Sequence, residues 1–150
     1  MTDTEYMALA LEEARKAYEE NEIPIGAVLV CHDMVLAMGH NRREDTFDPT
    51  SHAEIEVIRQ SSQFLSRWRL TDCTLYVTIE PCPMCAGAIM NARIGKLVYG
   101  SPNPLYGGIN SRFHIADSGV LNHTLEVRSG ILQEECKTLM DDFFSSHRTE

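Results

Sequence analysis

Two cysteines three positions apart, Cys82 and Cys85, form the first spacing in the sequence that could support chemistry. By itself, a C-x-x-C pair fits a redox couple, half of a metal site, or two buried thiols at a turn. The other cysteines, Cys31, Cys73 and Cys136, are isolated and provide no second pair for a structural zinc ribbon. We interpret these three as core residues. A metal site at Cys82 and Cys85 therefore needs a ligand of another type.

His52 is the best candidate for that ligand. Among the six histidines it alone has a glutamate, Glu54, at the second following position. Three protein ligands leave the fourth position of a tetrahedral Zn²⁺ open for water or hydroxide, which is typical of a catalytic site. The metal lowers the pKa of that water, and the start of a helix stabilises the thiolates. We predict one Zn²⁺ per subunit, bound by His52, Cys82 and Cys85.

Glu54 is the candidate catalytic residue. A carboxylate two residues from a ligating histidine can reach the metal-bound water without ligating the metal, take its proton and pass it to a substrate. The competing interpretation, a solvated helix charge, would leave an open zinc site without a base. Glu56 and Glu80 are interpreted as ordinary carboxylates, and Glu80 is also a candidate for supporting the ligands.

Alternating helical and extended patterns place these motifs in a layered α/β fold with partly parallel strands. We expect Asp48, Thr50 or Ser51 to cap the helix that begins near His52. The irregular stretch 101–123 has no regular period. Helices are predicted at 4–20, 52–62, 82–93 and 132–147, and strands at 23–31, 34–41, 74–79, 95–100 and 124–131.

Composition suits one globular domain spanning residues 1–150, with 43% hydrophobic and 23% charged residues. No run approaches the roughly 20 apolar residues of a membrane span, so we expect no membrane association. The first 20 residues are acidic and lack the pattern of a signal peptide, and the odd number of cysteines opposes a disulfide framework. These features predict a cytoplasmic protein. The net charge of -9 opposes nonspecific binding to nucleic acid.

Together, "HAE" at 52–54 and "PCPMC" at 81–85 match the H-x-E and P-C-x-x-C motif of zinc deaminases. The wider chain resembles the bacterial tRNA adenosine deaminases of the cytidine deaminase-like superfamily. The resemblance is carried in family order by "IPIGAVLV", "GHNRRE", "DPTSHAEIEVIR", "LYVTIEPCPMCAGAIMNARI", "LNH" and "GIL".

That resemblance implies a three-layer α/β/α fold with a five-stranded mixed sheet, and a homodimer. It also implies hydrolytic conversion of adenosine to inosine at the wobble position of a tRNA anticodon. In the same way it assigns substrate contacts to Asn41, Asn103 and Phe144, and a base-pocket wall to Val28 and Ala53. A base in a single-stranded anticodon loop is already partly unstacked, which favours its entry into a closed pocket.

The loop after residue 100 departs from the family pattern. Asn103 stands where the family usually has an acidic residue, and Leu105 where it has a lysine. Asn103 offers both a donor and an acceptor to a ribose hydroxyl, whereas Leu105 cannot pair with phosphate. Basic residues elsewhere could still converge into a groove. Those considered are Arg42, Arg43, Arg67, Arg69, Arg93, Lys96 and Arg112.

Two other functions remain open at this point. Deamination of a free nucleobase or nucleoside such as guanine fits the acidic charge and the altered loop, because a small ligand needs no basic groove. A noncatalytic zinc-containing subunit is the third, and the presence of Glu54 opposes it. The distribution of arginines around the pocket would discriminate the first two.

Overall fold

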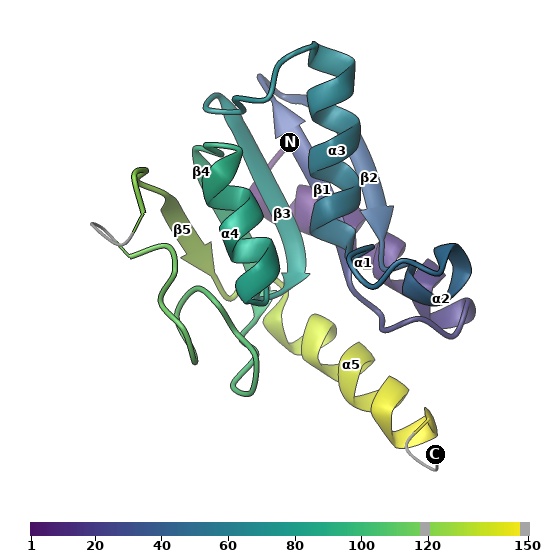
Figure 1. The fold of residues 1–150 in the computed structure, drawn as a ribbon. Helices are drawn as coiled ribbons and strands as arrows, with labels where there is room; N and C mark the ends of the chain where they lie inside the picture. The colour runs from purple at the N-terminus through teal and green to yellow at the C-terminus, as the bar shows by residue number, and fades with distance from the viewer. Residues whose placement is uncertain (118–120, 148–150) are drawn as a thin grey trace.

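The computed structural model describes residues 1–117 and 121–147, and Figure 1 shows helices on both sides of a single sheet. The predicted elements are present with ends shifted by a few residues. The described residues form α1 (Asp3–Glu19), β1 (Gly26–Cys31), β2 (Met34–His40), α2 (Arg43–Thr46), α3 (Ala53–Leu65), β3 (Cys73–Ile79), α4 (Pro83–Asn91), β4 (Lys96–Ser101), β5 (Glu126–Ser129) and α5 (Gln133–His147).

The sheet is mixed and has the strand order β2-β1-β3-β4-β5. β1 pairs antiparallel with β2 and with β3, whereas β3–β4 and β4–β5 are parallel. β1 and β2 are joined by a tight turn in which His32 and Asp33 both have positive φ, at 51° and 62°. Those angles match the right-handed twist of a hairpin.

Alternation along the central strands divides the core between the two faces of the sheet. Leu29 and Val77 face α3 and α4 in one fully buried cluster, while Val28 and Tyr76 pack with Met7 of α1 on the other side. α5 joins α1 on that second face, where its Cys136 is buried. The three-layer α/β/α fold with a five-stranded mixed sheet is therefore confirmed.

Two local details correct the expectations. The polar loop after β2 contains the short helix α2, which the sequence did not predict. The expected cap of α3 is also wrong, because its N-cap is His52, with no side-chain cap hydrogen bond. Asp48 Oδ1 instead accepts hydrogen bonds within its own turn, from the Thr50 N–H at 2.9 Å and the Thr50 hydroxyl.

Candidate active site

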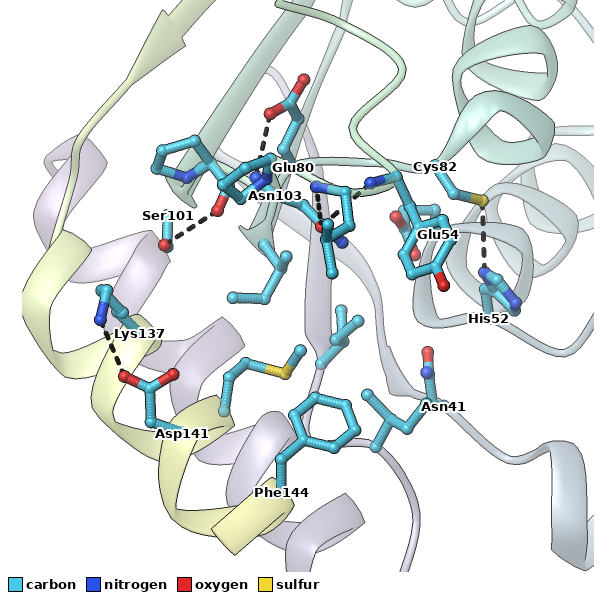
Figure 2. Close-up of a pocket in the computed structure, with 18 of the residues that line it drawn as sticks. Asn41, His52, Glu54, Glu80, Cys82, Ser101, Asn103, Lys137, Asp141 and Phe144 are labelled. Carbon is cyan, nitrogen blue, oxygen red and sulfur yellow. Dashed lines mark hydrogen bonds and ion pairs between the residues drawn. The ribbon is translucent and has the colours of Figure 1, made fainter. Parts of the chain in front are cut away.

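A cavity of about 880 Å³ opens where α3 and α4 begin, and the loop after β4 and one side of α5 complete its wall. Figure 2 shows, labelled around this space, residues that were predicted from the sequence. The lining is mostly apolar, and it includes exposed side chains such as Leu105, Tyr106 and Phe144. The predicted residues among its lining are Asn41, His52, Glu54, Cys82, Asn103 and Phe144.

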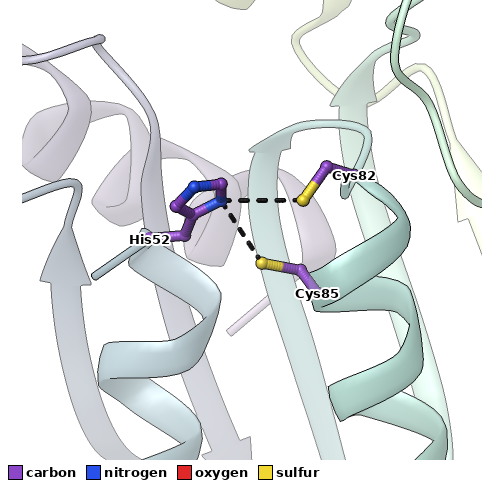
Figure 3. A group of neighbouring side chains, drawn as sticks. All are labelled: His52, Cys82 and Cys85. Carbon is purple, nitrogen blue, oxygen red and sulfur yellow. Dashed lines mark hydrogen bonds between the residues drawn. The ribbon is translucent and has the colours of Figure 1, made fainter. Parts of the chain in front are cut away.

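His52, Cys82 and Cys85 meet at one end of the cavity (Figure 3). His52 Nδ1 lies 3.7 Å from Cys82 Sγ and 3.5 Å from Cys85 Sγ. Ligand atoms of one tetrahedral zinc are about 3.5 to 3.8 Å apart, given Zn–S of about 2.3 Å and Zn–N of about 2.0 Å. The donor types and their spacing therefore fit a zinc ion bound by these three side chains.

The chain brings this group together by starting two helices side by side. His52 is the N-cap of α3 and Cys82 is the N-cap of α4, both with extended backbone. Pro83 occupies the first turn of α4, where its missing N–H costs nothing. Hydrogen bonds from Cys85 and His52 outweigh burial and lower the pKa of the Cys82 thiol to about 4. A thiolate at Cys82 is the form that binds a metal.

Glu54 lies in the first turn of α3 with 3% of its surface exposed. Burial raises the pKa of its carboxyl group to about 7. Its Oε1 atom is buried without a hydrogen-bond partner among the described residues. A buried acceptor of this kind needs a partner, and it fits a site that receives water and substrate beside the His-Cys-Cys group.

Asn41 joins the end of β2 to the start of α3. Its side chain is 2% exposed, and its Oδ1 accepts a 2.8 Å hydrogen bond from the Ala53 N–H. This bond satisfies one of the free N–H groups at the helix start. With Oδ1 engaged, the amide nitrogen is the part of Asn41 left to donate to a ligand in the cavity.

The structure separates Val28 and Ala53 from the other predicted pocket residues. Neither is among the described residues that line the cavity. Val28 is fully buried against α1, on the opposite face of the sheet from α3 and α4, so it belongs to the core and not to the pocket wall. Ala53 is fully buried as well and contributes its backbone N–H to Asn41.

Asn103 lines the cavity, but its amide oxygen is already used. Oδ1 accepts hydrogen bonds from the N–H groups of Leu105 and Tyr106, each at 3.2 Å. The expectation that Asn103 offers a free acceptor is therefore wrong, and only its amide nitrogen remains available. Phe144 projects from α5 with 48% exposure and makes an edge contact with Phe143.

Glu80 is a buried residue of the cavity wall whose importance the sequence did not reveal. It is not an ordinary solvated carboxylate, because it is 2% exposed and lies beside the cavity. Burial favours the neutral form, yet hydrogen bonds from Ser111 and from backbone N–H groups lower its pKa. Its place directly after a buried strand and before Pro81 was the available sequence signal.

A second group of possible metal ligands, Cys31, Asp72 and Cys73, lies at the far end of β1 and β3. Arg67 already binds Asp72 through one Nη2 atom, at 2.8 and 3.0 Å from the two carboxylate oxygens. That Nη2 also lies 4.0 Å from Cys31 Sγ. Because the guanidinium neutralises this group, we assign no metal to it. The burial of Cys31, Cys73 and Cys136 confirms their interpretation as core residues.

Basic side chains are scarce around the cavity. Among the described lining residues the lysines and arginines are Arg43 and Lys137, and Lys137 is paired with Asp141 at 2.8 Å. The guanidinium groups of Arg69 and Arg93 lie over the ring of Trp68, and none of these three residues lines the cavity. Further pairs are Arg42 with Asp45, Arg67 with Asp72 and Lys96 with Asp3.

This fold and this site define a deaminase, and the family model described as MafB19-like deaminase matches residues 1–148. The tRNA-specific adenosine deaminase of Haemophilus influenzae is 47% identical over 99% of this chain and 86% of its own length. That of Bacillus subtilis is 44% identical, over 99% and 92%. The chain therefore belongs to the MafB19-like deaminases, in the branch of the tRNA-specific adenosine deaminases.

Solved structures agree with this placement. One comes from a study of A-to-I editing by tRNA:A34 deaminases at the wobble position of transfer RNA. It has a TM-score of 0.88 and 44% identity, and the match covers 91% of this chain and 99% of that one. A guanine deaminase from Bacillus subtilis has a TM-score of 0.65 and 36% identity, over 68% of this chain and 66% of that one.

Proposed function

We propose that this protein is a zinc-dependent hydrolase that converts adenosine to inosine at the wobble position of a tRNA anticodon. The observation that carries the reaction type is the His-Cys-Cys group beside a buried Glu54 oxygen that has no hydrogen-bond partner in the described part of the chain. The substrate class rests on the near full-length similarity to tRNA-specific adenosine deaminases. Adenosine and water give inosine and ammonia.

In this proposal His52, Cys82 and Cys85 hold the metal. A zinc ion bound there would supply an acidified water molecule, because zinc lowers the pKa of bound water toward neutrality. Glu54 would accept one proton of the water at Oε1 and deliver it to the ring nitrogen. It would then carry the second proton of that water to the amine, which leaves as ammonia. A carboxyl pKa of about 7 suits both halves of that transfer near neutral pH.

The cavity supports a substrate larger than one base. At about 880 Å³ it lies near the upper end of the usual range for ligand pockets, roughly 300 to 1,000 Å³. Asn41 would donate to the target nucleoside through its amide nitrogen. The exposed rings of Tyr106 and Phe144 would stack with bases beside the target, an interaction that needs no charged side chain. These contacts belong to the proposal.

A second candidate, deamination of a free base such as guanine, is favoured by one observation. The cavity has few basic residues, and a free base carries no phosphate that would need them. The 36% identical guanine deaminase structure has the same architecture over about two thirds of each chain. Full-length similarity to the tRNA deaminases outweighs this observation.

The remaining features of the proposal concern the whole protein. We propose that residues 1–150 form one deaminase domain and that the protein acts as a homodimer in the cytoplasm. Five free cysteines, four of them buried, fit a reducing compartment. Among the described helices, none is both long and apolar enough to cross a membrane.

Ammonia release by the purified zinc protein tests the proposal. One reaction contains an anticodon stem-loop with adenosine at the wobble position, and the other contains free guanine and adenosine. Turnover confined to the stem-loop is expected. Turnover confined to free bases would replace the main proposal with the second candidate.

A further inference from the structure

One buried carboxylate, that of Glu80, receives an unusual number of hydrogen bonds from a single loop. Its Oε2 accepts from three successive N–H groups, those of Ile109, Asn110 and Ser111, at 3.1, 2.7 and 3.0 Å. Its Oε1 accepts from the Asn103 N–H at 3.1 Å and from the Ser111 hydroxyl. Successive N–H groups directed at one oxygen form an anion-binding concavity.

The same loop packs against Glu80 without room for a side chain between them. A Cβ atom on Gly107 would lie 2.4 Å from Glu80 Cδ, and one on Gly108 would lie 2.9 Å from the backbone of Cys82. The Gly108 N–H also donates to the Pro81 oxygen at 2.7 Å. The loop is thus fitted directly to the segment that leads into Cys82.

Loop 102–111 contains no helix or strand among its described residues, so its shape depends on these contacts. Between the two ends held by Glu80, Asn103 closes a tight turn by accepting from Leu105 and Tyr106. The turn presents these side chains to the cavity, where Leu105 and Tyr106 are 67% and 64% exposed. Figure 2 shows the Asn103–Glu80 bond at the edge of the cavity.

We propose that Glu80 is a positioning residue that fixes loop 102–111 and, through Asn103, Leu105 and Tyr106, sets how the part of the substrate next to the target base is bound. Glu80 lines the cavity, but both its oxygens are occupied by donors of the loop, so in this proposal it acts through the loop and not on the substrate or the transferred proton. Its loss therefore weakens substrate binding more than it slows the chemical step. The effect on substrate rests on the proposed deaminase function, whereas the effect on the loop does not.

The test compares Glu80→Gln with wild type. Gln keeps the shape of Glu80 but places an NH₂ group against N–H donors, which leaves buried donors unpaired. Hydrogen exchange at the amides of residues 109–111 should accelerate by about tenfold or more, because their protection requires that acceptor. The amides of β1 and β3 should be unchanged, and so should the zinc content.

In Glu80→Gln, KM should be about tenfold or more above that of wild type, with kcat changed far less. This pattern is expected when the lost interactions bind the ground state and the transition state equally. Glu80→Asp keeps the charge on a shorter side chain and should recover part of both losses. Glu13→Gln is the matched control: Glu13 is a buried carboxylate bonded to Lys16 and His40, and it does not line the cavity. It should leave exchange at 109–111 and KM unchanged.

Unchanged exchange at 109–111 in Glu80→Gln would overturn the proposal. So would a fall in kcat that accompanies zinc loss, because Glu80 would then act on the metal ligands. If Glu80→Gln fails to fold, Ser111→Ala removes one of the five donors and must show the same direction in both measurements. If wild type deaminates free guanine instead of the stem-loop, the proposed function and the substrate part of this proposal both fail, whereas hydrogen exchange at 109–111 still decides whether Glu80 fixes the loop.

Discussion

Two buried glutamates close to the candidate metal-binding group of His52, Cys82 and Cys85 have opposite hydrogen-bonding environments. Glu80 accepts five hydrogen bonds, which lower its pKa and keep it ionised. Glu54 has one oxygen without a hydrogen-bond partner among the described residues, and burial raises the pKa of its carboxyl group to about 7. A saturated carboxylate holds structure in place, whereas an unsaturated one of near-neutral pKa can exchange a proton. The difference between these roles lies in the neighbours and not in the residue type.

At this scale Glu54→Gln should retain zinc and lose turnover by at least about 100-fold, because the general base is removed while all three ligands remain. Atomic absorption and ammonia release measure the two quantities. Glu56→Gln, two residues further along α3 and bonded to Ser51, is the control that should stay near wild type. Wild-type turnover in Glu54→Gln would refute its catalytic role.

At the scale of elements, the site depends on the junction between β2 and α3. Asn41 closes that junction through the Ala53 N–H, one residue after the proposed metal ligand His52. Asn41→Ala should lower the free energy of unfolding by about 1 to 3 kcal/mol, since it leaves a buried donor unpaired. Urea denaturation measures this loss.

Asn41→Asp separates the two functions of this side chain. Aspartate keeps an acceptor for the Ala53 N–H but has no amide nitrogen to donate to the substrate. The stability of Asn41→Asp should therefore return toward wild type, while its KM for the stem-loop should be above that of wild type. Equal losses of stability in Asn41→Ala and Asn41→Asp would show that the hydrogen bond from the Ala53 N–H is not how Asn41 stabilises the fold.

The edge of the sheet is tied to α1 by Asp3. Burial alone would raise its pKa, but hydrogen bonds from Tyr76 and Arg128, both at 2.6 Å, and the nearby charges of Lys96 and Arg128 lower it. Because the folded-state pKa of Asp3 lies below the unfolded value of about 3.9, its ionised carboxylate stabilises the folded protein above about pH 3.9. This stabilisation is lost as the pH falls through the folded-state pKa.

Asp3→Asn should therefore destabilise the protein at pH 7 by about 1 kcal/mol, the gain of a charged over a neutral hydrogen bond. The difference from wild type should shrink as the pH falls below about 4. Urea unfolding of both proteins between neutral pH and pH 3 measures it. A pH-independent difference would mean that the charge of Asp3 is not responsible.

For the whole molecule, the main question is how a chain of net charge -9 would bind RNA. The described basic residues are largely paired or remote from the cavity, whereas its wall carries exposed apolar and aromatic side chains. Stacking and shape would then contribute more to affinity than phosphate contacts. Such binding should depend only weakly on salt.

Leu105→Lys tests this balance. A lysine at this exposed cavity position should tighten stem-loop binding at low salt and steepen the dependence of log K on log[salt] by about 0.7, the value for one added phosphate contact on a single strand. Phe64→Lys adds the same charge at the exposed C-terminal end of α3, which does not line the cavity. The same steepening in both variants would indicate a general charge effect.

The sequence by itself determined the chemistry of this protein. His52, Glu54, Cys82 and Cys85 are recognisable because each motif lies within a few residues at the start of one helix, so spacing alone predicts which side chains share a face. The helices and strands were predictable for a similar reason, since hydrophobic period is a local property. The family resemblance extended this prediction to the layers of the fold.

Only the tertiary structure decided which residues surround that chemistry. Glu80 accepts hydrogen bonds from a loop more than twenty residues further along the chain. Val28 lies outside the cavity because it projects from the face of β1 that packs against α1. The free N–H of Ala53 is satisfied by Asn41 and not by a local cap. Hydrogen bonds and burial between distant segments depend on how strands pair and helices pack, which short-range patterns do not encode.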